Sequence, residues 1–381
     1  MANVTASDSP PPPPTGPAHA DRTERPGGAE GPDAKKPAPG SKAVIHRLIQ
    51  SVVFVLILAL PGIIAGVVWS SEAAAPLLLG AIVGAVAAMS AGQKIALFQS
   101  FLLLLAAPVA IVAGEVPIAG AAIMALLCLG AGMTALWGMH TSFTMIPLVL
   151  AYPLIHPPHL GEIPIDRTST AYVGVLSLLL FGGALWMALV VPILAKHRRL
   201  LALQPASRAD ALTYTIVITV LCSANTFAVL VVRPSSQGAW LILTLIAVTQ
   251  LGPLLSLRRS VYRVVGTVLG ALIAAGIGAA VPDHGLQILL ALLTLTIALF
   301  MRSGGNYWIY VTFLTPTVVL LSSTGDVTAT SEYRLMYTLI AVSQVLLASA
   351  IVFGYQHLRS TGRAQPRPLT PEPLAAAPAA E

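Results

Sequence analysis

The sequence has 381 residues, of which 56% are hydrophobic and only 9% are charged, and its formal net charge is +6. Soluble domains carry about 25% charged residues, so this composition excludes a soluble enzyme. Between Arg47 and Arg359 the charged residues leave eleven uncharged runs of 18 to 46 residues. A helix needs roughly 20 apolar residues to cross the hydrocarbon core of a bilayer. The runs exclude a secreted disulfide scaffold and a porin-type barrel, whose strands alternate over about ten residues.

The two ends of the chain differ in composition from the part between them. Residues 1–43 are rich in Pro, Gly and Ala, include five prolines at 10–14, and contain almost no large apolar residue. Residues 359–381 have the same character. Because such segments cannot bury enough apolar surface to form a core, we predict that both tails are disordered and solvated.

The uncharged runs predict twelve transmembrane helices, since ten runs have the length of one span and the run 116–161 is long enough for two. The expected fold class is therefore an all-α polytopic membrane protein of the cell (inner, cytoplasmic) membrane. Six helices form a first unit at 44–195, a short cytoplasmic linker follows at 196–210, and six more form a second unit at 211–358. The expected spans are 48–70, 74–92, 95–113, 117–136, 139–155, 170–195, 211–232, 238–256, 264–281, 285–301, 306–322 and 335–357.

Lysine and arginine are distributed unequally between the loops that join these spans, with nine cations in one set of loops and three in the other. The nine are Lys94, Lys196, Arg198, Arg199, Arg208, Arg258, Arg259, Arg263 and Arg302. The three are Arg167, Arg233 and Arg334. Because cytoplasmic loops carry the excess of Lys and Arg, both termini are predicted to be cytoplasmic. The surplus positive charge is then a topology signal, and no nucleic-acid partner is expected.

The two predicted units share features at matching positions. The fifth and eleventh helices carry Thr144-Met-Ile-Pro147 and Phe313-Leu-Thr-Pro316. Each is followed by an outer loop that ends in an acid and an arginine, Asp166-Arg167 and Glu332-Tyr-Arg334. Because six is an even number, both units enter the membrane from the same side. We therefore predict two parallel six-helix repeats, related by an axis along the membrane normal.

The spans contain no obvious catalytic or ion-binding group. None carries Asp, Glu, Lys or Arg near its middle, although buried ionisable residues usually mark proton relays in transporters. No catalytic motif or phosphate loop is present, so no enzyme activity and no cofactor are expected. His156-Pro-Pro-His159 supplies at best half of a metal site, and Cys128 and Cys222 lie inside apolar spans, so no metal site is predicted. The candidates for proton coupling are groups at span ends: Asp166, Arg167, Glu332 and Arg334.

Pro147 and Pro316 point to a substrate site near the middle of the membrane. A proline removes a backbone hydrogen bond, and such a break survives in lipid only where it faces protein or a water-filled cavity. Interrupted helices at matching positions of two repeats are the best sequence indication of a midplane site. Thr144, Thr312 and Thr315 lie within a turn of the prolines and could line it. The alternative is ordinary helix packing, because proline and glycine are common in membrane helices.

A basic, glycine-rich stretch runs from Arg258 to Gly270. Gly266 and Gly270 form a small-xxx-small face that lets two helices approach closely, as do Gly80 and Gly84 in the second span. The cations at the inner mouth would attract anions from the cytoplasm. Positive-inside topology explains the same cations about as well.

Several motifs in the second half resemble those of the fusaric-acid-resistance-like (aromatic acid exporter) family. They are Arg263-x-x-Gly266-Thr-x-x-Gly270 with Trp240 before it, Asn306-Tyr307, Phe313-Leu-Thr-Pro316 and Glu332-Tyr-Arg334. The resemblance covers residues 210–357 and carries the family's positions over to Arg263, Gly266, Thr267, Gly270, Asn306, Tyr307, Thr315, Pro316 and Arg334. Members commonly have a sizeable soluble domain between two six-helix halves, whereas the linker here is short, so the chain is similar to a short form of the family.

The resemblance implies an inner-membrane efflux protein for toxic aromatic compounds or weak organic acids, driven by protons and working with a periplasmic adaptor protein. From the residues themselves, paired prolines and a basic inner mouth favour the export of small amphipathic organic anions. The candidate substrate-binding residues are Thr144, Pro147, Arg263, Gly266, Thr267, Gly270, Asn306, Tyr307, Thr312, Thr315 and Pro316. The alternative is a non-transporting membrane scaffold or modulator of a separate efflux complex. The expected surroundings are a lipid bilayer, and a homo-oligomer is left open.

Overall fold

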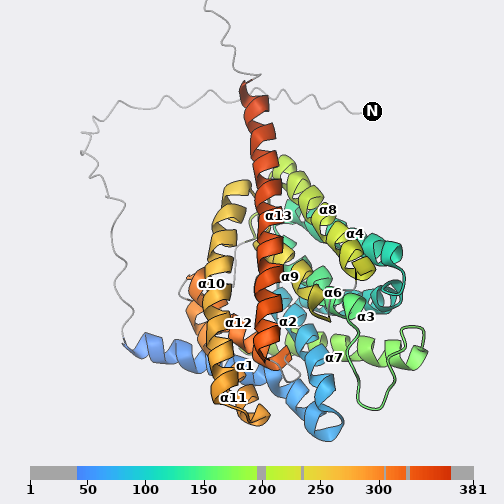
Figure 1. The fold of residues 1–381 in the computed structure, drawn as a ribbon, viewed down its shortest axis with the longest axis vertical. Helices are drawn as coiled ribbons and strands as arrows, with labels where there is room; N and C mark the ends of the chain where they lie inside the picture. Colours follow the sequence, from blue (N-terminus) through green and yellow to red (C-terminus); the bar gives the residue numbers. More distant parts are fainter. Residues whose placement is uncertain (1–40, 195–202, 233–235, 304–305, 323–326, 362–381) are drawn as a thin grey trace, which may run out of the picture. The chain divides into compact units, whose positions relative to one another are not determined.

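The computed structural model describes residues 41–194, 203–232, 236–303, 306–322 and 327–361 (Figure 1). The predicted tails, and residues 196–202 of the predicted linker, lie largely outside these ranges. Residues 1–44 form one unit, of which only the start of α1 is described, and residues 45–381 form a second, to which all that follows refers. The described residues are helical apart from turns and one isolated bridge between Leu160 and Ile163.

Thirteen α-helices and three short 3-10 helices follow one another along the described chain. In the predicted first unit they are α1 (Ser41–Val68), η1 (Ser71–Ala73), α2 (Ala74–Ser90), α3 (Gln93–Ala113), α4 (Pro117–Met133), η2 (Thr134–Trp137), α5 (His140–Phe143), α6 (Met145–Ile155) and α7 (Thr170–Leu194). In the second they are α8 (Arg208–Val232), η3 (Ser236–Gly238), α9 (Ala239–Val248), α10 (Pro253–Ala280), α11 (His284–Ser303), α12 (Tyr307–Ser322) and α13 (Val327–Thr361).

Eight of these helices are long and apolar enough to cross a membrane, and they are α1, α3, α4 with η2, α7, α8, α10, α11 and α13. The fold is therefore that of a multi-pass helical membrane protein. The shorter apolar helices are α2, α5 with α6, α9 and α12. They occupy the second and fifth places of each predicted unit, so the pattern of helix lengths recurs between the units. Twelve crossings and a six-helix repeat stay predictions.

Glycines bring α2 and α7 into backbone contact. A Cβ atom placed on Gly80 would lie 1.9 Å from the carbonyl oxygen of Leu180, and one on Gly84 would lie 2.0 Å from that of Ala184. Only glycine leaves room for this approach, which confirms the close contact predicted from the small-xxx-small spacing. Because both contacts advance together by four residues, α2 and α7 run parallel.

Glycines also bring α10 and α12 into close contact. A Cβ atom on Gly266 would lie 2.7 Å from the carbonyl oxygen of Trp308, and one on Gly270 would lie 2.6 Å from that of Thr312. The two helices therefore also run parallel. In the predicted order, α2 and α7 are the second and sixth spans, and α10 and α12 are the ninth and eleventh. Spans whose numbers differ by an even number run in the same direction, so both contacts agree with that order.

The predicted boundaries around the eighth and ninth spans are wrong. Instead of one span at 238–256, α9 ends at Val248 and α10 begins at Pro253, a residue favoured at the first position of a helix. Gly252 between them has φ +103°, a conformation that favours glycine. Because the predicted spans were bounded by charges, charged residues were placed in loops. The backbone is helical through several of them: Lys94, Arg208, Arg258, Arg259, Arg263, Arg302, Glu332 and Arg334.

Candidate functional site

Two arginines that were predicted at span ends lie inside helices and are buried. Arg263 follows ten residues after the start of α10, Arg334 follows seven residues after the start of α13, and each is only 3% exposed. The prediction that Arg263 and Arg334 lie in the loops between spans is therefore wrong. Its physical reason is that a helix can continue through an arginine whose side chain finds aromatic and polar neighbours on other helices, which the charge pattern does not reveal.

The depth of both arginines follows from the way α10 and α13 pack. The end of α10 meets the start of α13, because a Cβ atom on Gly278 would lie 2.8 Å from the Cβ of Val327. At a rise of 1.5 Å per residue, Arg334 lies about 10 Å and Arg263 about 22 Å below this level. With the hydrocarbon core about 30 Å thick, both lie at membrane depth when this level marks its edge. Arg258 then lies near the opposite edge.

Aromatic rings from other helices contact the guanidinium groups. The Cζ atom of Arg334 lies 4.4 Å from the centre of the Trp240 ring of α9, and that of Arg259 lies 4.4 Å from the Tyr307 ring of α12. Tyr307 interacts with Arg263 as well as with Arg259. Rings stabilise buried cations through their negative faces, but they do not neutralise the charge.

Several buried polar atoms around these arginines have no hydrogen-bond partner among the described residues. They are Nε of Arg259, Arg263 and Arg334, Oγ of Ser260 and Oγ1 of Thr267. Ser260, Arg263 and Thr267 follow one another at helical spacing and so share one face of α10. We call these five residues, together with Trp240 and Tyr307, the arginine site.

The arginine site holds an excess of positive charge. No described carboxylate forms an ion pair with Arg263 or Arg334, and the two arginines are close enough for their charges to interact. An unpaired buried charge and an unsatisfied buried donor are both costly. The site therefore has the chemistry to bind an anion, with guanidinium groups for a carboxylate and ring faces for an apolar body.

Of the sequence-predicted substrate residues, Arg263, Thr267 and Tyr307 lie in the arginine site, and most of the others lie beside it at the α10–α12 contact. Gly270 meets Thr312, Thr315 and Pro316 there. Pro316 cannot donate to the carbonyl of Thr312, and this carbonyl faces Gly270 instead. The hydroxyls of Thr312 and Thr315 donate to carbonyls within α12.

Asn306 and the candidates of the first half lie apart from the arginine site. Asn306 is exposed before the start of α12. Thr144 separates α5 from α6 and donates to the carbonyl of His140 at 2.8 Å. Pro147 is the third residue of α6 and lies in its first turn, where a proline removes no hydrogen bond within that helix, whereas Pro316 lies inside α12. The two prolines therefore differ in their local structure.

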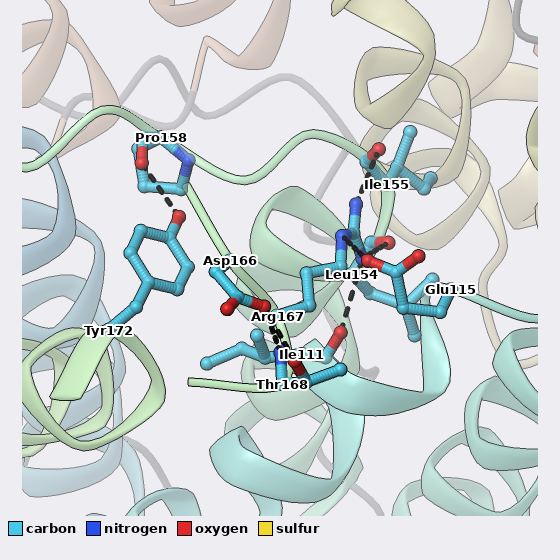
Figure 2. A network of polar contacts seen from close by, with 9 residues as sticks. All are labelled: Ile111, Glu115, Leu154, Ile155, Pro158, Asp166, Arg167, Thr168 and Tyr172. Carbon is cyan, nitrogen blue, oxygen red and sulfur yellow. Dashed lines mark hydrogen bonds and ion pairs between the residues drawn. The ribbon is translucent and has the colours of Figure 1, made fainter. Parts of the chain in front are cut away.

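Arg167, a predicted coupling residue, has a dense set of partners (Figure 2). Its guanidinium donates to the carbonyls of Ile111 at 3.2 Å, Leu154 at 2.7 Å and Ile155 at 3.2 Å, and it forms an ion pair with Glu115 at 3.5 Å. These carbonyls belong to the last turns of α3 and α6, where helices lack internal donors. Arg167 therefore fastens two helix ends.

The two acidic residues among the predicted coupling groups lie at the surface, Asp166 before α7 and Glu332 within α13. Glu332 is exposed, and Asp166 accepts hydrogen bonds from the side chain and backbone of Thr168, which lower the pKa of its carboxyl group. Nearby, burial, His159 and Arg167 lower the pKa of His156. A role of these groups in coupling stays a prediction.

Sequence reasoning missed Trp240, Arg259 and Ser260 as parts of the site. Trp240 and Arg259 had been noted, one in a motif and one in a basic cluster. The spacing of Ser260, Arg263 and Thr267 on one helical face was the signal that could have added Ser260. The contact of Trp240 with Arg334 joins residues 94 positions apart and has no local signal.

Comparison with known proteins supports the resemblance noted in the sequence. Residues 221–348 match the family described as fusaric acid resistance protein-like, a stretch that includes the whole arginine site. The match covers about a third of the chain. Neither the curated proteins nor the solved structures gave a match. Together with the eight long apolar helices, the family match indicates a multi-pass membrane protein of a transporter type.

Proposed function

We propose that this protein exports small amphipathic organic anions, aromatic weak acids above all, and that the arginine site binds them on their way through the membrane. The observation that carries the proposal is the pair of buried arginines, Arg263 and Arg334, without a carboxylate partner among the described residues. A permanent cation at membrane depth costs free energy, and such residues usually mark a functional site. An anionic substrate would supply the missing partner.

The chemistry of the site favours a carboxylate attached to an aromatic or apolar body. Arg263 and Arg334 each offer a charge-assisted donor fork to a carboxylate. Tyr307 and Trp240 stand beside them and offer ring faces to the rest of the substrate. Since the arginines are about 12 Å apart along the helix axes, an anion can pass from one to the other.

Direction and driving force extend the proposal. Arg259 lies toward the end that the loop charges predict to be cytoplasmic, so it would collect anions there and pass them to Arg263. Export toward Arg334 follows from this order. Proton coupling and a periplasmic adaptor protein are inferred from the family resemblance.

The proposal is tested by flux into vesicles of defined composition. The purified full-length protein is reconstituted, and uptake of a radiolabelled aromatic carboxylate such as benzoate is followed with and without a pH gradient. Arg263→Gln and Arg334→Gln should each lower kcat/KM about 10- to 100-fold, the equivalent of one charge-assisted hydrogen bond. Arg258→Gln is the matched control, because Arg258 is exposed and contacts Tyr262 of its own helix.

Wild-type flux in correctly inserted Arg263→Gln and Arg334→Gln proteins would refute the role of the arginine site. An absence of flux in the wild type for every aromatic acid tested, together with a stoichiometric membrane partner in purification, would favour the scaffold alternative.

A further inference from the structure

Three sulfur atoms meet in the interior where α4 packs against α8. Met124, Cys128 and Cys222 are all fully buried. The Cys128 thiol donates to the thioether of Met124 at 3.8 Å. Cys222 interacts electrostatically with Cys128 and belongs to the same buried core cluster. We call these three residues the sulfur cluster. The sequence predicted no metal site from the cysteines, because it gave no sign that two separate spans bring them together.

The packing of α4 against α8 brings these three side chains to the same level of the helix pair. Met124 and Cys128 are four residues apart and so lie on one face of α4. A Cβ atom on Gly132 of α4 would lie 2.9 Å from Cα of Thr215 in α8, and Gly120 approaches Leu230 farther along. The two helices therefore run antiparallel at close range, and Cys222 of α8 faces the sulfur-bearing face of α4.

The cluster differs from the usual buried cysteine, which serves as a small hydrophobic residue. Two thiols from different helices and one thioether converge, and the bonds that link them are of the weak sulfur type. Soft sulfur ligands of this kind select soft cations such as Cu(I), whereas hard cations require oxygen ligands. Metal–thiolate bonds of about 2.3 Å in a trigonal arrangement set sulfur atoms about 4 Å apart. The contact of Met124 with Cys128 is already near this separation.

A pocket beside α8 lies near the cluster but has none of its three residues in the lining, and its lining residue nearest to Cys222 along α8 is Val217. Tyr214 of α8 is one residue of its lining, and the same side chain lies within electrostatic range of both cysteines. The other side of the pocket is formed by the turn between α9 and α10 and by the last part of α13. Arg259 also acts electrostatically on Tyr214.

We propose that Met124, Cys128 and Cys222 form a binding site for one Cu(I) ion. Binding replaces the two thiol protons, which leave to water, and forms two metal–thiolate bonds and one metal–thioether bond. The filled site carries one net negative charge. No redox change takes place, and the site lies apart from the arginine site.

The test is an anaerobic titration of the purified full-length protein with Cu(I), in competition with the chromophoric chelator bathocuproine disulfonate. The wild type should bind one Cu(I) per chain, and X-ray absorption should show only sulfur ligands. Cys128→Ser and Cys222→Ser should each weaken binding at least 100-fold, and Met124→Leu about 10-fold. Met187→Leu is the matched control, because Met187 is also fully buried but belongs to the core between α2 and α7.

Two results would overturn the proposal. The first is a wild type that binds no more Cu(I) than a Cys128→Ser/Cys222→Ser double variant. The second is an X-ray absorption spectrum that shows oxygen or nitrogen ligands at the bound copper in place of sulfur. Met124→Leu conserves size and apolarity and keeps the comparison usable if a serine variant fails to fold. Because transport is not measured, the outcome is independent of the proposed export function.

Discussion

Replacement of Arg167 by methionine should destabilise the fold, because it removes the shared partner of two helix ends. Arg167 is 8% exposed and donates to three backbone carbonyls, of which those of Ile111 and Leu154 are bonded in buried surroundings. Methionine fills much of the same volume but donates no hydrogen bond. The carbonyls therefore lose their donor, with little change in packing.

The expected size follows from these contacts. A buried acceptor that loses its partner costs about 1 to 3 kcal/mol, so the two buried carbonyls together give about 4 kcal/mol. The ion pair with Glu115 adds little, because that carboxylate is 51% exposed and exposed pairs contribute about 0 to 1 kcal/mol. Glu115→Gln should accordingly change the free energy of unfolding by less than about 1 kcal/mol.

The assay is reversible unfolding in mixed micelles at rising fractions of a denaturing detergent, followed by circular dichroism. Arg334→Met is the informative comparison, since Arg334 is equally buried but is stacked on Trp240 without a carboxylate. Removal of an unpaired buried charge should leave stability within about 1 kcal/mol of the wild type, or raise it. A loss below about 1 kcal/mol in Arg167→Met, or an equal loss in Glu115→Gln, would refute the reasoning.

Two further predictions concern helix packing and the outer loop. Gly270→Ala should lower the melting temperature, because the new Cβ atom would lie 2.6 Å from the backbone of α12, whereas Gly276→Ala in the same helix meets nothing within 4 Å and should be neutral or stabilising. Burial, His159 and Arg167 hold the pKa of His156 below 6.5, so the unfolded chain binds more protons than the folded one. The contribution of neutral His156 to the free energy of unfolding is fully present above about pH 6.5. It falls as the pH drops toward the pKa of His156 in the folded state. Thermal unfolding at pH 7.5 and 5.5 should therefore show a larger loss for the wild type than for His156→Gln, and an equal loss would contradict the assignment.

Helix positions could be predicted from the sequence, because the length of an apolar run has to match the thickness of a bilayer. Most predicted spans fall on one helix of the structure, and the glycine contacts of Gly80, Gly84, Gly266 and Gly270 were also predicted. The predicted boundaries failed at the α9–α10 turn, where charge marked neither the end at Val248 nor the start of the next helix.

The candidate site was predicted only in part. The family-like motif led to Arg263, Thr267 and Tyr307, but the paired prolines led to Thr144 and Pro147, which lie in the first half away from the arginine site. The pattern of Asp166-Arg167 and Glu332-Tyr-Arg334 suggested that the two arginines have equivalent roles. The structure separates them: Arg167 binds helix carbonyls, and Arg334 faces an aromatic ring.

By itself the sequence determined the class of protein, the place of most of its apolar helices, and the family that its second half resembles. These features depend on local composition, because the length and hydrophobicity of each segment decide whether it can cross the bilayer. Only the tertiary structure decided which charges are buried and which groups they meet. The partners of Arg263, Arg334 and Cys128 come from other helices, so no local pattern contains them, and the energy of a buried charge or thiol depends on those partners.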